Sequence, residues 1–222
     1  LHLETWDEEF DWSNRATSHY CVVAGDISQD RKLTLNCLKK LGQNYQAVFY
    51  IDGNDEHKDN ISNLGQSYKD FTRQLQRIPN VVYLQDNVVV IEGVALLGTN
   101  GWWGFDFDLG IGSEQSQQWY AEKERYPQSV IDDIRRMSTT DANYMMSSVK
   151  KLQTHNDVQR IVIVTHTVPN PALIAHDISL AGTSRFNTMG NLYMDHALAV
   201  EYGQKLSQHF QDEVGVTVVN DI

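Results

Sequence analysis

Three hydrophobic segments of this chain each run into a side chain that can bind a metal ion. The segments span residues 21–24, 48–51 and 161–164, and the side chains that follow them are those of Asp26, Asn54 and His166. Short apolar runs of this kind are typical of buried strands in an open α/β sheet, where ligands bind beyond the carboxyl ends of the strands. We therefore expect a carboxylate, an amide oxygen and an imidazole to meet in one place.

The first half of the chain has the pattern of a parallel sheet. After each of the first two strands, apolar residues recur at spacings of three and four, over residues 34–41 and 61–78. Ser28 is a candidate N-cap for the first of these helices, Gly42 is expected to end it, and Pro79 is expected to end the second. Strand, helix, strand, helix predicts parallel strands with covered faces.

The middle of the chain changes character. Residues 81–84, 88–91 and 94–97 predict three short strands, and the last two form a hairpin through Gly93. A second sheet, or a mixed edge on the first, is therefore expected. Helical periodicity returns over residues 130–152, a helix is expected near 192–210 and a last strand at 216–219. No repeat or linker divides the chain, so we expect one domain over 1–222.

Charge and length limit the function classes. The chain has 222 residues, a formal net charge of -11 and a mean hydropathy of -0.43. An acidic chain of this kind does not favour a long nucleic acid as partner, although bound metal ions can reverse the local field for a small phosphate substrate. The apolar runs are far shorter than the roughly 20 residues that span a membrane. We expect a cytoplasmic protein with no membrane partner.

The residue types at the strand ends suit metal chemistry. A carboxylate has two oxygens, so Asp26 could bridge two ions, and Asn54 would add a neutral oxygen. His166 and His2 would add nitrogen donors, which suit Mn, Fe, Zn or Ni better than Ca or Mg. Taken singly, a Gly-Asp or Gly-Asn-Asp sequence is more often an ordinary turn. Their combination at three strand ends favours metal binding.

At these residues the chain resembles the calcineurin-like metallophosphoesterase family. Leu1-His2-Leu3-Glu4 matches the second half of the family's Asp-x-His motif, and Gly25-Asp26 matches its Gly-Asp motif. Gly53-Asn54-Asp55-Glu56 and Val164-Thr165-His166 are similar to its third and fourth motifs. The resemblance implies a four-layer α-β-β-α sandwich with two facing mixed sheets. It also implies two divalent metal ions held by His2, Asp26, Asn54 and His166.

Two features depart from the family pattern. The family's Gly-His-x-His motif, expected near residue 212, is not in the sequence, and neither is the Asp expected before Leu1. We infer that residues precede Leu1. Near residue 212, either a loop is missing from this sequence or the protein has lost the motif. Asp55 stands where many family members have a histidine close to the leaving group. Asp55 is a candidate general acid only with a raised pKa, and His57 is a possible substitute.

The leading hypothesis from the sequence is a dinuclear-metal phosphoesterase. A hydroxide bridging the two ions would attack the phosphate ester of a small substrate. The alternative is a non-catalytic scaffold of the same fold that binds protein partners, and the two departures motivate it. Trp102 and Trp103 could wall a substrate cleft, although packing in the core is the more common role of such residues.

Overall fold

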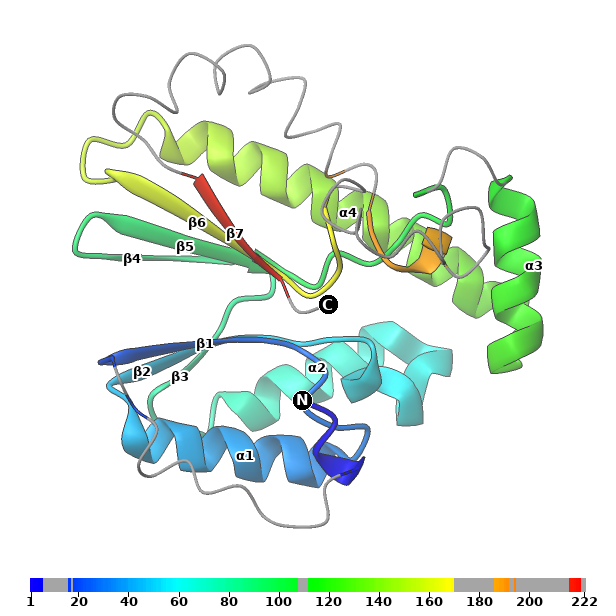
Figure 1. The fold of residues 1–222 in the computed structure, drawn as a ribbon, viewed down its shortest axis with the longest axis horizontal. Coiled ribbons are helices and arrows are strands. Elements are labelled where there is room, and N and C mark those ends of the chain that lie inside the picture. Colours follow the sequence, from blue (N-terminus) through cyan, green and yellow to red (C-terminus); the bar gives the residue numbers. More distant parts are fainter. Residues whose placement is uncertain are drawn as a thin grey trace.

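The computed structural model describes residues 1–5, 16, 18–107, 112–169, 186–191, 194 and 216–220. Its helices and strands form an α/β fold with two sheets that face one another, and helices lie on the outer side of each sheet (Figure 1). The predicted α/β class is therefore confirmed.

The first sheet consists of three parallel strands. β1 (Tyr20–Ala24), β2 (Ala47–Ile51) and β3 (Val81–Tyr83) lie in the order β1-β2-β3. The connections between them contain α1 (Arg31–Asn44) and α2 (Leu64–Leu75), which return the chain to the same edge each time. The prediction that both sheets are mixed is wrong for this one, because each strand is joined to the next through a helix and every pair is parallel.

The start and the end of α1 differ from the pattern read in the sequence. Asp30, not Ser28, caps the helix, and its carboxylate accepts a 2.8 Å hydrogen bond from a backbone N–H of the first turn. The helix continues past Gly42 to Asn44. Gly42 serves packing rather than termination, since a Cβ there would lie 2.7 Å from the carbonyl oxygen of Pro79.

The helix expected over residues 61–78 begins later than predicted. A 3-10 segment, η2 (Asp55–Asn63), precedes α2 and contains a non-helical residue, Asn60, with φ of -133°. Asn63 then caps α2 by accepting a 3.1 Å hydrogen bond from the N–H of Gln66. The apolar pattern of 61–78 thus crosses a kink that hydrophobic spacing alone does not reveal.

The second sheet is mixed. β4 (Asn87–Ile91) and β5 (Val94–Thr99) form the predicted antiparallel hairpin, with positive φ angles at Glu92 and Gly93 in the turn. β6 (Arg160–Thr165) and β7 (Val216–Asn220) add parallel strands, in the order β4-β5-β6-β7.

Two long helices lie on the side of the second sheet, and two further short 3-10 turns complete the described elements, one of them beside α1 (Figure 1). α3 (Ser113–Glu124) and α4 (Gln128–Leu152) are the long ones, and the short 3-10 turns are η1 (Leu3–Thr5) and η4 (Phe186–Thr188). The helix predicted near 192–210 lies outside the described residues. None of the helices in the described part is long and apolar enough to cross a membrane.

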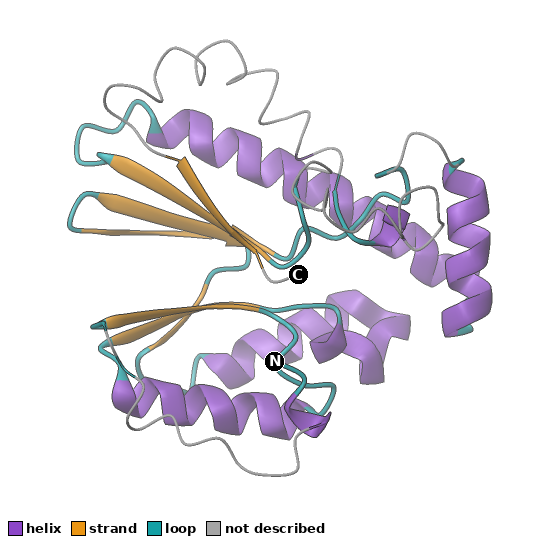
Figure 2. Cartoon of the chain, in the orientation of Figure 1, coloured by secondary structure: helices purple, strands orange, loops and turns teal. Residues whose placement is uncertain are grey.

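Three hydrophobic clusters fill the spaces between these elements. One lies between the two sheets and contains Phe49, Ile51, Leu84, Leu96 and Val164. A second joins α1 and α2 to the first sheet, and a third joins α4 to the second sheet. Figure 2 shows the resulting arrangement, with helices outside and strands inside.

A fourth hydrophobic cluster contains Trp102 and Trp103. Trp102, Trp103 and Phe105 are 0–3% exposed and pack against Ile131 and Ile134 of α4. They belong to the core, as the commoner role of such residues suggested, and do not wall a substrate cleft.

The cluster between the sheets should carry much of the stability. Phe49→Ala removes a side chain that is 1% exposed, so we expect a loss of about 3–5 kcal/mol in the free energy of unfolding. Val22→Ala, at a residue that is 37% exposed in the neighbouring strand, is the control and should cost less than about 1 kcal/mol. Urea denaturation measures both, and equal losses would contradict the assignment of Phe49 to the core.

Candidate metal centre

The site lies at the carboxyl ends of β1, β2 and β6. Asp26 follows β1, Asn54 follows β2 and His166 follows β6. His166 Nε2 lies 3.4 Å from Asp26 Oδ1 and 3.3 Å from Asn54 Oδ1. β1 and β2 belong to the first sheet and β6 to the second, and the two facing sheets bring these strand ends together. Residues more than a hundred positions apart therefore come into contact, as the sequence predicts.

The hydrogen bonds around His166 leave three atoms with lone pairs facing one another. His166 Nδ1 lies 2.9 Å from the carbonyl oxygen of Ala24, an acceptor, so Nδ1 carries the hydrogen. In the neutral imidazole, Nε2 then presents a lone pair toward the oxygens of Asp26 and Asn54. The amide of Asn54 is itself oriented, because its Nδ2 donates to Asp55 Oδ1 at 2.9 Å. A cation among these lone pairs would satisfy all of them at once.

The N-terminal turn brings His2 to the same place. The backbone N–H of His2 donates to the carbonyl of Asp26 at 2.9 Å, and that of Leu3 donates to the carbonyl of Ile27 at 2.8 Å. The His2 imidazole then lies 3.8 Å from Asp26 Oδ2 and 3.3 Å from Asp55 Oδ2. The four residues proposed as ligands from the sequence are therefore linked in one group, His2 and His166 through Asp26 and Asn54 through His166.

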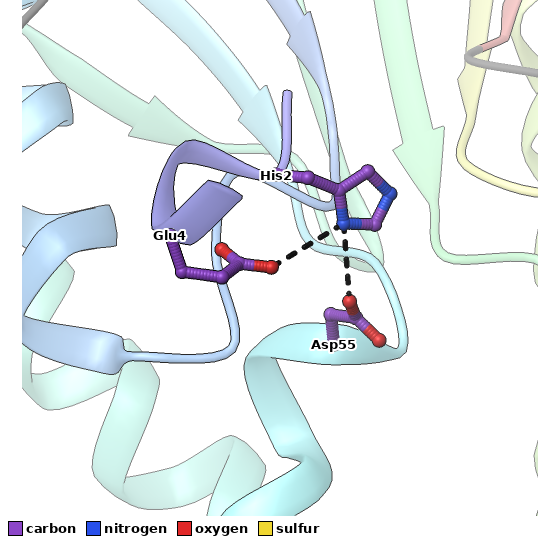
Figure 3. Close-up of side chains that lie close together, drawn as sticks. All are labelled: His2, Glu4 and Asp55. Carbon is purple, nitrogen blue, oxygen red and sulfur yellow. Dashed lines mark ion pairs between the residues drawn. The ribbon is translucent and has the colours of Figure 1, made fainter. Parts of the chain in front are cut away.

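Figure 3 shows a group of possible donors around His2. His2 Nδ1 lies 3.5 Å from Glu4 Oε1 and 3.3 Å from Asp55 Oδ2, and one ligand atom from each of the three residues lies within 4.8 Å of the others. Glu4 was not among the residues predicted from the sequence, although its place two residues after His2, in the turn η1, is the signal that could have identified it. Asp55 was predicted from the sequence as a catalytic acid, whereas here it lies among the possible metal ligands.

The Asp55 carboxylate is surrounded by hydrogen-bond donors. Its side chain is 3% exposed and accepts hydrogen bonds from Gln29 (3.1 Å) and Asn54 (2.9 Å), besides its contact with His2. Lys58 Nζ lies 2.8 Å from Asp55 Oδ1, and the Lys58 side chain is 33% exposed. Although partial burial lowers the pKa of Lys58, the ion pair with Asp55 raises it above its ordinary value, so Lys58 supplies a lasting positive charge beside the cluster.

His57 does not join this site, which corrects its proposed role as a catalytic residue. Its side chain is 0% exposed, and both ring nitrogens are occupied: Nε2 lies 2.6 Å from Asp52 Oδ2 and Nδ1 lies 2.8 Å from Ser67 Oγ. The ring also packs against Tyr68. A histidine held in this way cannot exchange protons with a substrate that arrives from solvent.

Glu56 holds the two loops of this site together, a role that was not predicted from the sequence. Its buried carboxylate accepts hydrogen bonds from the backbone N–H groups of Asp26 (3.1 Å), Ile27 (2.7 Å) and Gly53 (2.8 Å). Burial, and after it the charge of Asp26, raise the pKa of Glu56 to about 7. Glu56 thus joins the loop after β1 to the loop after β2. The sequence shows that Glu56 lies two residues after Asn54, but it does not show that the side chain points into the protein.

The two loops approach one another more closely than ordinary side chains allow. A Cβ at Gly53 would lie 2.6 Å from the backbone nitrogen of Asp26. Asp26 itself has φ of 46°, in the left-handed region that residues other than glycine adopt at a cost. Such backbone strain at the end of a strand, held by Glu56, is a common property of functional sites.

The donors fit a divalent transition-metal ion. Imidazole nitrogens together with carboxylate and amide oxygens suit Mn, Fe, Zn or Ni. The predicted pair of divalent ions stays a prediction. The chain near residue 212, where two further ligands were expected, lies outside the described residues.

Comparison with known proteins gives one informative likeness. No family model and no curated protein matches the chain. Among solved structures, the chain is similar to the phosphopantetheinyl hydrolase from Mycobacterium tuberculosis, with a TM-score of 0.57 and 12% sequence identity over 80% of this chain and 67% of that one. At this identity the likeness concerns the fold.

This comparison overturns the function predicted from the sequence. The similar structure is named for the hydrolysis of a phosphopantetheinyl group, and it gives no support to a dinuclear phosphoesterase. The predicted function, hydrolysis of a phosphate ester by a hydroxide between two metal ions, is therefore wrong for this chain.

Loss of one donor should weaken ion binding without unfolding the chain. Asp26→Asn keeps the shape of the side chain but removes its charge, so we expect the affinity for Mn²⁺ to fall at least about tenfold. Isothermal titration calorimetry measures it, and circular dichroism checks folding. Asp157→Asn, on a side chain that is 85% exposed, is the control. An unchanged Mn²⁺ affinity in Asp26→Asn would show that Asp26 is not a ligand.

Proposed function

We propose that this chain is a metal-dependent hydrolase whose substrate carries a phosphopantetheinyl group. The observation that carries the proposal is the set of lone pairs at the three strand ends, where His166 Nε2 faces Asp26 Oδ1 at 3.4 Å and Asn54 Oδ1 at 3.3 Å. The phosphopantetheinyl hydrolase of similar fold suggests the substrate class.

A divalent cation would be held by Asp26, Asn54, His166 and His2. When bound, it supplies a Lewis acid that polarises the bond to be broken. Asp55 lies at the border of this group and also holds Lys58. Because the His2 imidazole is 52% exposed, this side of the cluster is open to solvent and to a substrate.

Lys58 would bind the anionic part of the substrate. Its ammonium is fixed by Asp55 at 2.8 Å but has donors left for a second acceptor, since an ammonium group has three. A phosphate group next to the cluster would meet this charge in a chain that is otherwise acidic, with a net charge of -11. Lys58 thereby orients the substrate, while Glu56 keeps Asp26 and Asn54 at their working distance.

The family resemblance forms part of the same proposal. Of the four residues matched to calcineurin-like metallophosphoesterase motifs, His2 and His166 each lie beside Asp26, and Asn54 lies beside His166. This grouping supports the resemblance. The two facing sheets with outer helices are consistent with the family's four-layer sandwich. We also retain as proposals a cytoplasmic location and a small substrate rather than a long nucleic acid.

The direct test is hydrolysis of a peptide that carries a phosphopantetheinyl group. With Mn²⁺ added, the parent chain should release the group in a reaction that mass spectrometry detects, and removal of the metal by a chelator should abolish it. Asp26→Asn and His166→Ala should each be nearly inactive. If the parent protein binds Mn²⁺ but releases nothing, the hydrolase proposal is wrong and the scaffold alternative gains support.

Lys58 should affect the use of the substrate more than the binding of metal. Lys58→Gln removes one charge-assisted contact to the substrate, so we expect kcat/KM to fall about tenfold with little change in Mn²⁺ affinity. Lys39→Gln, at an exposed residue of α1, is the matched control. Equal kcat/KM values in the two variants would refute the role of Lys58 in substrate binding.

A further inference from the structure

A cleft separate from the candidate metal centre lies along α2. It has a volume of about 780 Å³ and is lined by α2, by the connection from β3 to β4 and by Met137 of α4. The chain crosses from the first sheet to the second in this connection (Figure 1). Clefts of about 300–1,000 Å³ are the usual size of small-molecule sites. None of the residues proposed for the metal centre lines it.

Two tyrosine rings form rigid walls of this cleft. The Tyr83 hydroxyl donates to Asp52 Oδ1 at 2.5 Å, and the Tyr83 ring stacks on Tyr50 with centroids 6.0 Å apart. The Tyr68 hydroxyl accepts from the Trp102 indole N–H at 2.8 Å, and the Tyr68 ring packs on His57. Both rings are half-buried and fixed at both ends, which prepares them to contact a flat apolar group at low entropic cost.

Positive charge lies on the α2 side of the same cleft. Lys69 and Arg73 both line it and are four residues apart, one turn of the helix. Arg73 forms an ion pair with Asp70, with 2.9 Å between Nη1 and Oδ1. Lys69 takes part in no ion pair in the described part of the chain. Asp86 is the one carboxylate among the lining residues. In a chain of net charge -11, this wall favours an anion.

We propose that this cleft binds a small molecule that combines a flat ring with a phosphate, of the class of a nucleoside monophosphate. The ring lies against Tyr68, Tyr83 and Met137, and the phosphate meets Lys69 and Arg73. The cleft is a binding site separate from the metal centre, so it does not depend on the hydrolase proposal.

Two side chains connect this cleft to the metal centre. Tyr83 holds Asp52, which lies two residues before Asn54. Gln85 accepts a 2.7 Å hydrogen bond from the backbone N–H of Asn100, and the carbonyl of Asn100 accepts one of 3.1 Å from the N–H of His166. A ligand that contacts Tyr83 and Gln85 is therefore two hydrogen bonds away from residues of the metal centre, and its binding shifts their positions.

Calorimetry with AMP, adenosine and inorganic phosphate tests the binding site. We expect AMP to bind the full chain at one site without added metal, and adenosine or phosphate alone to bind at least about tenfold more weakly. Lys69→Gln should lower the AMP affinity about tenfold and leave adenosine unaffected, whereas Asp26→Asn should leave AMP binding unchanged. Absence of AMP binding overturns the proposal. Loss of AMP binding in Asp26→Asn but not in Lys69→Gln also overturns it, because AMP would then occupy the metal centre.

The link between this cleft and the metal centre is tested by a separate measurement. In ¹H–¹³C spectra of the imidazole groups, AMP should shift the resonance of His166, assigned through its loss in His166→Asn. Tyr83→Phe should retain AMP binding but reduce this shift, since it removes the hydrogen bond to Asp52. An unchanged His166 resonance on saturation with AMP would refute the connection, even where binding is observed.

Discussion

The carboxylate of Glu56 is the group on which the geometry of the site depends. It gathers three backbone N–H groups from the loops after β1 and β2, at 2.7–3.1 Å, and so holds Asp26 and Asn54 side by side. A buried carboxylate is costly unless donors surround it, and its neighbour Asp26 adds repulsion. The raised pKa of Glu56, about 7, reflects that burial and that repulsion. The strained backbone of Asp26 and the close approach of Gly53 persist because this clamp holds the two loops together.

Behind this clamp lies a polar network in the interior of the protein. Asp52 accepts hydrogen bonds from Tyr83 and Asn100 and contacts His57. Burial alone would raise the pKa of Asp52, but the hydrogen bond and charge of His57, followed by Tyr83, hold it below its ordinary value. Asp52 is therefore held as a charged carboxylate, and its hydrogen bonds fix the end of β2. This explains why His57 has a structural place although it lies only three residues from Asn54.

The sequence was sufficient for the parts of the structure that depend on periodicity and strand direction. β1 and β2 are parallel and share one carboxyl edge, so the nearness of Asp26 and Asn54 follows from strand direction. His166 follows β6 of the second sheet, and its contact with them depends on how the two sheets face one another. The hairpin at Gly93 followed from turn chemistry alone. The features that could not be predicted depend on which way a side chain points within a loop. Glu4 and Glu56 look like ordinary acidic residues in the sequence, and His57 looks like a catalytic histidine until its burial is known.

The account's central claim is that the strand ends and the N-terminal turn form one cation site. Crystals grown with Zn²⁺ and measured at the zinc absorption edge would locate the ion through its anomalous scattering. The account predicts a peak at about 2.0–2.2 Å from His166 Nε2 and from an Asp26 oxygen. A peak found only between His2 and Glu4, out of reach of Asp26 and His166, would contradict it.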